Sequence, residues 1–384
     1  MAWNKVKVGD LGRIVTGKTP KTIDRDNYNG PIMFVTPSDN MESKYIYSTG
    51  KTITEKGKLS VKGAIVPAGA VCVSCIGSDL GKVVITTEEC VTNQQINSII
   101  VDVDKYDIDF IYYAMMILGK ELNFHSKTST AVPIVNKSSF SSYEISCPTI
   151  GEQRKIASVL SALDDKIDNN AQINENLSDQ IQAIYNSEFN PTTHTPSGIL
   201  ADICHYSSDR IAVSELSVST YYSTENMQPN KMGSVDATSL PSIAQTTGCH
   251  KGDVLISNIR PYFKKIVYVT DDGYGCSTDV LCFVPKDDQY SAFLFGTLYR
   301  DRFFDYMVAG SKGTKMPRGD KQQIMNFPVV LPDKESLNRF NGLVVPMLDQ
   351  IAFNRIESSR LTALRDALLP RLMSGELDVS NLKL

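Results

Sequence analysis

The stretch Ile156-Ala-Ser-Val-Leu160-Ser-Ala-Leu163-Asp-Asp-Lys-Ile167-Asp-Asn-Asn170 spaces its apolar side chains alternately four and three positions apart and ends on a polar residue. This spacing keeps one stripe of a helix facing a partner helix, as in a coiled coil. The same pattern continues to about Phe189. The sequence therefore predicts a helix over residues 151–189, about 58 Å long.

A second helix with the same stripe is expected about 184 residues later, near the C-terminus. Each helix carries two columns with a period of seven residues. In the first helix the columns are Ile156, Leu163, Asn170, Leu177 and Ile184, and Leu160, Ile167, Asn174, Ile181 and Glu188. In the second helix they are Phe340, Met347, Asn354, Leu361 and Leu368, and Val344, Ile351, Ser358, Arg365 and Leu372.

Asn170 and Asn354 occupy the same place in their columns, near the middle of each helix. A buried Asn in an apolar seam costs stability unless it finds a hydrogen-bond partner, and it then fixes the register of the helices. Because the middles of antiparallel helices meet, we expect these two residues to lie close together and to set the register. The alternative is that both amides face solvent.

Two prolines interrupt the second helix in the sequence. Pro346 is expected to kink it or to mark a fresh start, because the proline ring clashes with the preceding turn. Pro370 is expected to end the regular helix just before Arg371.

The rest of the chain repeats itself with the same shift of about 184 residues. The segment Pro67-Ala-Gly-Ala-Val-Cys-Val-Ser74 matches His250-Lys-Gly-Asp-Val-Leu-Ile-Ser257, a turn followed by an apolar strand. Residues 130–133 likewise match 314–317. Each half has short β-type runs broken by Gly, Pro, Asn and Ser, then a short helix, then the long helix.

These patterns predict an α+β chain with two similar mixed α/β domains, separated by two long antiparallel coiled-coil helices and related by a pseudo-twofold internal repeat. The expected segments are a first domain over 1–150, a spacer helix over 151–190, a second domain over 191–333, and a second spacer helix with a tail over 334–384. Such a spacer would hold the two domains about one turn of DNA apart, roughly 34–36 Å.

Composition narrows the classes of function. A net charge of −4 and a pI near 5.7 argue against phosphate binding by the whole surface, so a nucleic-acid site would be a local basic patch. The sequence shows neither a signal peptide nor a run of apolar residues long enough to span a bilayer. Eight scattered cysteines are typical of reduced thiols, and a cytoplasmic location away from membranes is expected.

The chain resembles the specificity subunit of Type I restriction-modification systems over nearly its whole length. The most specific matches are residues 151–167 and 368–377, which resemble the two conserved helical regions. Residues 16–20 resemble the opening loop of a first target-recognition domain, and residues 252–262 and 312–320 resemble blocks of a second one.

This resemblance implies a non-catalytic subunit in which each recognition domain reads one half of a bipartite target in double-stranded DNA. The helices would set the gap and dock two methyltransferase subunits, and restriction subunits could join the complex. No cofactor or metal is expected on this chain. The complex would use S-adenosylmethionine, and ATP and magnesium when restriction subunits are present.

Base readout requires polar and cationic side chains on loops. In the second half, the candidate DNA contacts are Asn258, Arg260, Tyr262, Lys264, Lys265, Lys312, Lys315 and Arg318, with Tyr221, Tyr222, Ser277 and Thr278 as further candidates. In the first half they are Lys18, Thr19, Lys21, Ser74, Ser78, Lys82, Gln94, Gln95, Lys127 and Thr128. The alternative is that these segments are ordinary solvated loops, which are polar in any protein.

Three alternatives compete with this interpretation. The letters of Gly12-Arg-Ile-Val-Thr-Gly17-Lys18-Thr19 match a P-loop, but no helical pattern follows them, so the match is interpreted as accidental. A methyltransferase acting on adenine would need an Asn/Asp-Pro-Pro-aromatic motif, and the chain contains no Pro-Pro pair. A scaffold that binds only proteins remains open. Cys72 and Cys75 form a lone pair in a strand-like run, which disfavours a metal site.

Overall fold

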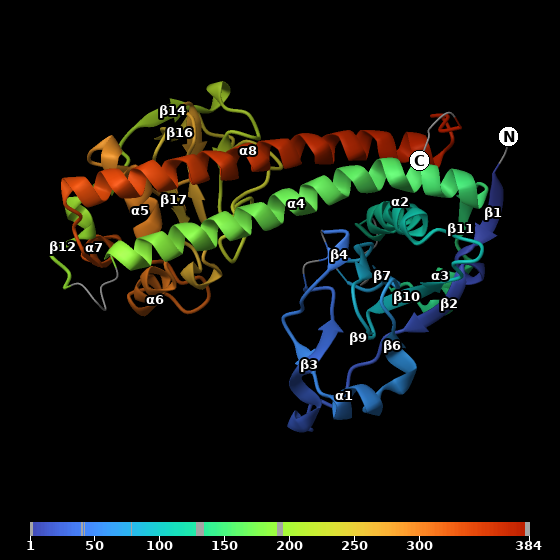
Figure 1. Ribbon diagram of the computed structural model, residues 1–384. Coiled ribbons are helices and arrows are strands. Elements are labelled where there is room, and N and C mark those ends of the chain that lie inside the picture. The colour runs from blue at the N-terminus through green and yellow to red at the C-terminus, as the bar shows by residue number, and fades with distance from the viewer. Residues whose placement is uncertain are drawn as a thin grey trace. The chain divides into compact units, whose positions relative to one another are not determined.

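The computed structural model describes residues 3–39, 41, 43–77, 79–127, 134–189 and 195–380 (Figure 1). The chain divides into two compact units. Unit 1 comprises Met1–Asp168 and Arg360–Leu384, and unit 2 comprises Asn169–Ser359. Each unit therefore contains one half of each long helix as well as its own sheets.

Unit 1 contains three sheets and three shorter helices. Its main sheet has the strand order β2 (Gly12–Thr16), β10 (Ile96–Val101), β7 (Val71–Ser74), β8 (Val83–Thr86), β4 (Tyr45–Ile46). A second sheet has the order β5 (Thr52–Ile53), β3 (Tyr28–Val35), β9 (Cys90–Thr92), β6 (Ile65–Val66), and β1 (Asn4–Lys7) pairs with β11 (Glu144–Cys147). The helices are α1 (Glu55–Ser60), α2 (Ile108–Lys127) and α3 (Lys137–Ser142), with 3-10 turns at Val8–Asp10, Arg25–Asn27 and Lys62–Ala64.

Unit 2 has a closely similar set of elements. Its main sheet has the order β13 (Cys204–Tyr206), β20 (Val280–Pro285), β17 (Val254–Ser257), β18 (Ile266–Tyr268). Its second sheet has the order β14 (Arg210–Ala212), β16 (Gln245–Cys249), β19 (Tyr274–Cys276), β15 (Tyr221–Tyr222), and β12 (Gly198–Ile199) pairs with β21 (Pro328–Val329). The helices are α5 (Ser291–Leu298), α6 (Asp301–Ala309) and α7 (Lys321–Met325), with 3-10 turns at Leu200–Asp202, Val213–Glu215, Pro261–Phe263 and Asp288–Tyr290.

The predicted internal repeat is confirmed by the topology of the two main sheets. The order β2-β10-β7-β8 of unit 1 recurs as β13-β20-β17-β18 in unit 2, and all of these pairings are antiparallel. In the second sheets, β9 pairs in parallel with β3 and antiparallel with β6, and β19 pairs in the same way with β15 and β16. Both units thus form the α+β module expected from the sequence.

The central strands explain why short apolar runs could be recognised in the sequence. All four residues of β7, and all four of β17, are buried. A strand covered on both faces is apolar at nearly every position, rather than at alternate positions. In unit 1 the cover comes from α2, which contacts β7 and β8 and lies between the main sheet and the long helix α4 (Figure 1).

The two long helices are α4 (Ile150–Phe189) and α8 (Lys334–Met373). Every residue of the four predicted columns is buried or partly buried, which confirms the seam. Within unit 2 the helices run antiparallel, because Asn170 contacts Ser358 whereas Glu188 contacts Arg339.

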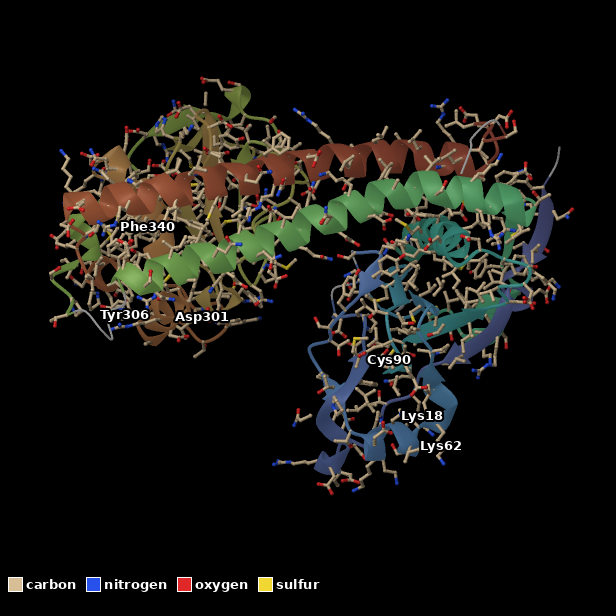
Figure 2. All side chains as sticks on the ribbon, in the orientation of Figure 1. Lys18, Lys62, Cys90, Asp301, Tyr306 and Phe340 are labelled. Carbon is tan, nitrogen blue, oxygen red and sulfur yellow. The ribbon has the colours of Figure 1, made fainter. Side chains whose placement is uncertain are left out.

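The long helices also belong to the cores of the units. Phe340 of α8, labelled in Figure 2, is fully buried, and its ring centroid lies 5.5 Å from that of Phe189 and 6.0 Å from that of Tyr185, both on α4. Phe293 of α5 stacks on Tyr185 at 5.5 Å. Displacing either helix would therefore expose the aromatic core of unit 2.

Asn170 and Asn354 lie together, as their column positions predict. Asn170 is fully buried, and its Nδ2 donates to the backbone oxygen of Asn354 at 3.4 Å and to Oε2 of Glu357 at 2.7 Å. The Nδ2 of Asn354 donates to Oδ1 of Asn174 at 2.9 Å. These amides form a polar layer in the seam and do not face solvent. Their role in fixing the register stays a prediction.

The prediction that the helix ends at Pro370 was wrong, and so was a fresh start at Pro346, whereas a kink at Pro346 stays a prediction. α8 is one continuous helix through Pro346, and it extends beyond Pro370 to Met373. A proline removes the hydrogen bond to the carbonyl four residues earlier, which here belongs to Gly342 or Asp366. Both prolines and both of these residues are exposed. Water can therefore satisfy the freed carbonyls, while the buried face of the helix remains packed.

Unit 1 places a charged pair between the long helices. Nη1 of Arg365 lies 2.7 Å from Oδ1 of Asp164, and the hydroxyl of Tyr113 on α2 donates to Oδ2 of the same carboxylate at 2.5 Å. At the corresponding positions, shifted by 184 residues, unit 2 has the buried pair Ile181 and Leu348. The two modules therefore share a topology but hold their helices with different chemistry.

Asp168, one turn after Asp164 on α4, is a half-buried carboxylate of this region. Burial, followed by the negative charges of Asp164 and Asp165, raises the pKa of Asp168 to about 6. Its Oδ2 is buried and has no hydrogen-bond partner among the described residues. Because the pKa is raised in the folded state, the contribution of Asp168 to stability is present at low pH and is lost as pH rises through about 6.

We therefore expect Asp168→Asn to stabilise the protein at pH 8 by about 1 kcal/mol, after allowance for partial exposure, and to have little effect near pH 4. Urea unfolding of the variant and the parent protein at several pH values would measure this difference. Asp104→Asn, which removes an exposed carboxylate from the same unit, is the matched control. A gain from Asp168→Asn that does not change with pH would contradict the assignment.

Candidate nucleic-acid interface

Three loops of unit 2 meet at one end of its main sheet. The backbone N–H of Asn258, just after β17, donates to the oxygen of Asp279, just before β20, at 2.8 Å. The N–H of Arg260 donates to the oxygen of Pro317 at 2.8 Å. The segments 258–264, 277–279 and 312–318, which the sequence singled out separately, are thus joined by backbone hydrogen bonds.

Equivalent backbone contacts between loops occur in unit 1. There the segment after β7 is bonded to the segment before β10 and to residue 134. The bond Ser74 N–Lys82 O of 2.9 Å in unit 1 corresponds to Ser257 N–Lys265 O of 3.2 Å in unit 2. The bond Cys75 N–Gln95 O of 2.7 Å corresponds to Asn258 N–Asp279 O of 2.8 Å. The β-bridge Ile76–Ile134 corresponds to the β-bridge Ile259–Arg318. The two units therefore present loops at equivalent strand ends, whereas the side chains on those loops differ.

The loop 312–318 is a hairpin with cations at both of its ends. Lys312 and Arg318 exchange backbone hydrogen bonds of 2.9 and 3.0 Å. Gly313 closes the turn with φ at +104°, a conformation that suits glycine. Lys315 and Met316 are exposed at the tip. This geometry fixes the backbone of both end cations and leaves the tip accessible.

Three of the cations on these loops are paired with carboxylates. Lys312 Nζ lies 2.6 Å from Asp320 Oδ2, and Arg318 Nη2 lies 3.0 Å from Asp279 Oδ1. Lys264 Nζ lies 2.9 Å from Oδ1 of Asp301, a residue labelled in Figure 2. The basic patch expected from the sequence is therefore partly neutralised by Asp279, Asp301 and Asp320.

Lys265 differs from these surface cations. Its ammonium donates to the backbone oxygen of Thr224 at 2.6 Å, and burial lowers its pKa. Lys265 therefore ties two loops of unit 2 together, and in this conformation it is not free to reach a phosphate.

Asn258 and Arg260 show local strain and unpaired polar atoms. Asn258 is 8% exposed, and its Oδ1 has no hydrogen-bond partner among the described residues. The same is true of the Nε of Arg260, whose backbone adopts φ +50°. Unsatisfied buried polar atoms and positive φ at a non-glycine residue both cost free energy, and such features gather at functional sites.

The aromatic candidates divide into two groups. Tyr221 is 6% exposed, and Tyr222 stacks on Tyr274 with ring centroids 5.6 Å apart. Both tyrosines pack within unit 2, so the structure argues against them as DNA contacts. Tyr262 and Phe263 are exposed at 48% and 39%, with ring centroids 4.8 Å apart. Phe263 was not among the predicted contacts, although it follows Tyr262 in the same segment.

Ser277 and Thr278 lie on the loop that carries Asp279. Ser277 is partly buried, and its backbone N–H donates to the oxygen of Tyr222 at 2.8 Å. Thr278 is exposed. Of the two, only Thr278 presents its side chain openly to solvent.

In unit 1 the candidates near the start of β10 come together. Lys18, labelled in Figure 2, is exposed, and its backbone N–H donates to Thr92 O at 2.8 Å. The hydroxyl of Thr19 donates to Oε1 of the exposed Gln94 at 2.5 Å. Lys21 is exposed as well. Gln95 is partly buried, and its Oε1 accepts from Asn93 at 2.9 Å.

Ser74 was a wrong choice as a DNA contact. It is fully buried, its hydroxyl donates to the oxygen of Asp79, and it accepts from the N–H of Lys82 at 3.0 Å. Its hydroxyl therefore holds a turn. The ammonium of Lys82 lies 3.0 Å from Asp79. Ser78, Thr128 and the side chain of Lys127 lie outside the described residues.

The structure also decides two of the rival motifs. Residues 12–16 form strand β2, and the N–H groups of Gly17 and Lys18 are bonded to Ile96 and Thr92, so this segment does not cradle phosphate as a P-loop does. Burial raises the pKa of Cys75 to about 11 and that of Cys72 to about 12, so both thiols are protonated.

The described residues lack two kinds of feature. No helix in this part of the chain combines the length and apolar character needed to cross a membrane. Among the same residues, no group of three or more His, Cys, Asp or Glu side chains is placed to hold a metal ion.

The fold and the loops together define a class of protein: a duplicated α+β module with a pair of long antiparallel helices, and with polar loops at the same strand ends of each copy. Residues 2–179 match the family described as Type I restriction modification DNA specificity domain. This match covers the first half of the chain, and over nearly its whole length the chain is similar to a specificity subunit of a Type I restriction enzyme.

Individual relatives agree with this assignment. The Type I restriction enzyme MjaIX specificity subunit of Methanocaldococcus jannaschii is 26% identical, covering 99% of this chain and 94% of that protein. The HindI specificity subunit of Haemophilus influenzae is 33% identical over 149 residues, which are 38% of this chain and 32% of that protein. The crystal structure of a Type-I restriction-modification system S subunit from M. genitalium has the same fold, with a TM-score of 0.51, 16% identity and 96% of both chains covered.

If the loops of unit 2 contact DNA, Arg260→Ala should weaken DNA binding by the assembled complex by about 1–3 kcal/mol and relax the preference for particular bases. Lys315→Ala, at the exposed tip of the hairpin, should instead weaken binding to all sequences and make its salt dependence shallower by about 1. Titration of labelled duplexes at several salt concentrations would separate the two effects. Lys251→Ala, at the opposite end of β17, is the control, and footprints unchanged by both loop variants would remove these assignments.

Proposed function

We propose that this chain is the DNA sequence-recognition subunit of a Type I restriction-modification complex, and that each unit reads one half of a bipartite target. The duplicated module is the observation that carries the proposal. Both copies hold their loops with the same backbone bonds at the same strand ends. The two units share these backbone hydrogen bonds but carry different side chains on the loops. Such an arrangement suits two domains that recognise different half-sites.

The side chains of unit 2 provide the chemistry of readout. An Asn amide can pair with adenine in the major groove, and an Arg guanidinium can pair with guanine. Asn258 and Arg260 each have a buried polar atom with no hydrogen-bond partner among the described residues, so the protein itself does not fully satisfy either side chain. Lys315 lies exposed at the hairpin tip and can contact phosphates.

We further propose that the chain performs no chemistry itself. Methyl transfer from S-adenosylmethionine would be carried out by two methyltransferase subunits, and cleavage by restriction subunits that use ATP and magnesium. The outer side of α8 supports docking of a methyltransferase subunit, because Val345, Phe353 and Ile356 are exposed there at 37%, 61% and 44%. Apolar side chains at helical spacing are typical of a surface that another helix covers.

Deletion of this chain from its host should abolish one methylated DNA motif that has two specific parts separated by a fixed gap of unspecified bases. Methylome sequencing with and without the chain would reveal the motif. Restoring the chain with Arg260→Ala should alter one half of the motif and leave the other half intact. A scaffold without base readout would instead leave the sequence of the motif unchanged, and that result would refute the proposal.

We propose that the helix pair sets the gap between the two half-sites. Seven residues inserted into α4 between Ile167 and Asn170, and seven into α8 between Ser358 and Leu361, lengthen both helices by about 10 Å, or about three base pairs. The methylated motif should then show a longer gap and unchanged half-sites. Replacing the residues at the same points without changing the length is the control. A fixed gap after the double insertion would show that the helices are not the ruler.

A further inference from the structure

Two of the cations on the reading loops of unit 2 are held by carboxylates that also belong to those loops or adjoin them. Arg318 is paired with Asp279, and Lys312 is paired with Asp320. Asp279 lies on the loop that receives the N–H of Asn258, so the acid sits among the candidate base contacts.

The pair of Arg318 and Asp279 uses only part of the guanidinium. Nη2 of Arg318 donates one hydrogen bond of 3.0 Å to Oδ1 of Asp279. An Arg side chain has five N–H donors. Arg318 is 54% exposed, so its remaining donors are open to a base edge or to a phosphate. The carboxylate thus restrains the direction of the guanidinium without occupying it.

In the pair of Lys312 and Asp320, backbone hydrogen bonds fix the position of the carboxylate. Oδ1 of Asp320 accepts from the N–H groups of Gln322 and Gln323 and caps helix α7. Oδ2 of the same carboxylate lies 2.6 Å from the ammonium of Lys312, which is 81% exposed. The cap fixes the acid in place, whereas the lysine keeps two further donors for DNA.

Such pairs affect target and non-target DNA differently. Binding to non-target DNA depends almost wholly on attraction between cations and phosphates. A cation already paired with a carboxylate carries little net charge, so it attracts phosphates weakly. Readout of a correct base needs directed hydrogen bonds, and the unused donors of Arg318 can make these while its contact with Asp279 persists.

We propose that Asp279 and Asp320 are specificity-determining residues that neutralise Arg318 and Lys312 toward phosphates and so suppress binding to non-target DNA. This inference rests on the proposed function and adds to it a role for acidic residues. It also accounts for a recognition subunit with a net charge of −4, because the reading loops carry their own counter-ions.

The test compares Asp279→Asn and Asp320→Asn with the parent chain, each assembled with its methyltransferase subunits. Asn at position 320 retains an oxygen to cap α7, so the substitution removes mainly the charge. One probe is a duplex carrying the motif found by methylome sequencing, and the other is the same duplex with both half-sites scrambled. For each variant, affinity for the scrambled duplex should rise roughly two- to fivefold, and its salt dependence should steepen by about 1. The preference for target over scrambled DNA should fall.

Asp271→Asn is the matched control, because it removes an equal charge from the exposed segment between β18 and β19. An equal rise with Asp271→Asn would overturn the proposal, since the effect would then be one of net charge alone. A change in preference for a single base with Asp279→Asn, without tighter binding to scrambled DNA, would assign Asp279 to direct readout and also overturn it. Failure of the parent complex to prefer its motif would instead refute the proposed function.

Discussion

The seam between α4 and α8 is the constraint on which the rest of the structure depends. Its residues complete the core of both units, and the aromatic cluster around Phe340 could not stay buried without both helices. Within the seam, unit 2 uses the amide layer of Asn170 and Asn354, and unit 1 uses the pair of Asp164 and Arg365. Polar groups in such a place are satisfied in one register and left unpaired in others, whereas apolar contacts tolerate sliding.

The fold was predictable where a regular spacing of apolar residues, or the internal duplication, extended over a long segment of the sequence. The columns with a period of seven located both helices because a coiled-coil seam demands that spacing. The duplication was visible because turns and buried strands recur at a fixed distance. Pro370 was misjudged for a physical reason. A sequence does not reveal that Pro370 faces solvent, where water replaces the lost hydrogen bond and the helix continues.

The candidate site was predictable by segment more than by residue. Loops rich in Lys, Arg and Asn were found because such side chains cluster visibly, and the structure joins three of these loops in unit 2. The orientation of each side chain depends on distant partners. Ser74 turns inward to hold a turn, Tyr222 stacks on Tyr274, and Asp279 meets Arg318 across 39 residues of sequence. None of these pairings leaves a local pattern in the chain.

The unbroken path of α8 through Pro346 has a consequence for whatever lies along its outer side. The carbonyl oxygen of Gly342 accepts no backbone hydrogen bond within the helix, because residue 346 is a proline. This oxygen adjoins the exposed apolar surface that includes Val345. A wholly apolar helix that covered this surface would exclude water from this oxygen and leave it without a hydrogen-bond partner. The surface thus favours a binding partner that places a hydroxyl, amide or ammonium donor at that oxygen. A partner whose contact ends before this point, so that a water molecule remains bound there, would fit equally well.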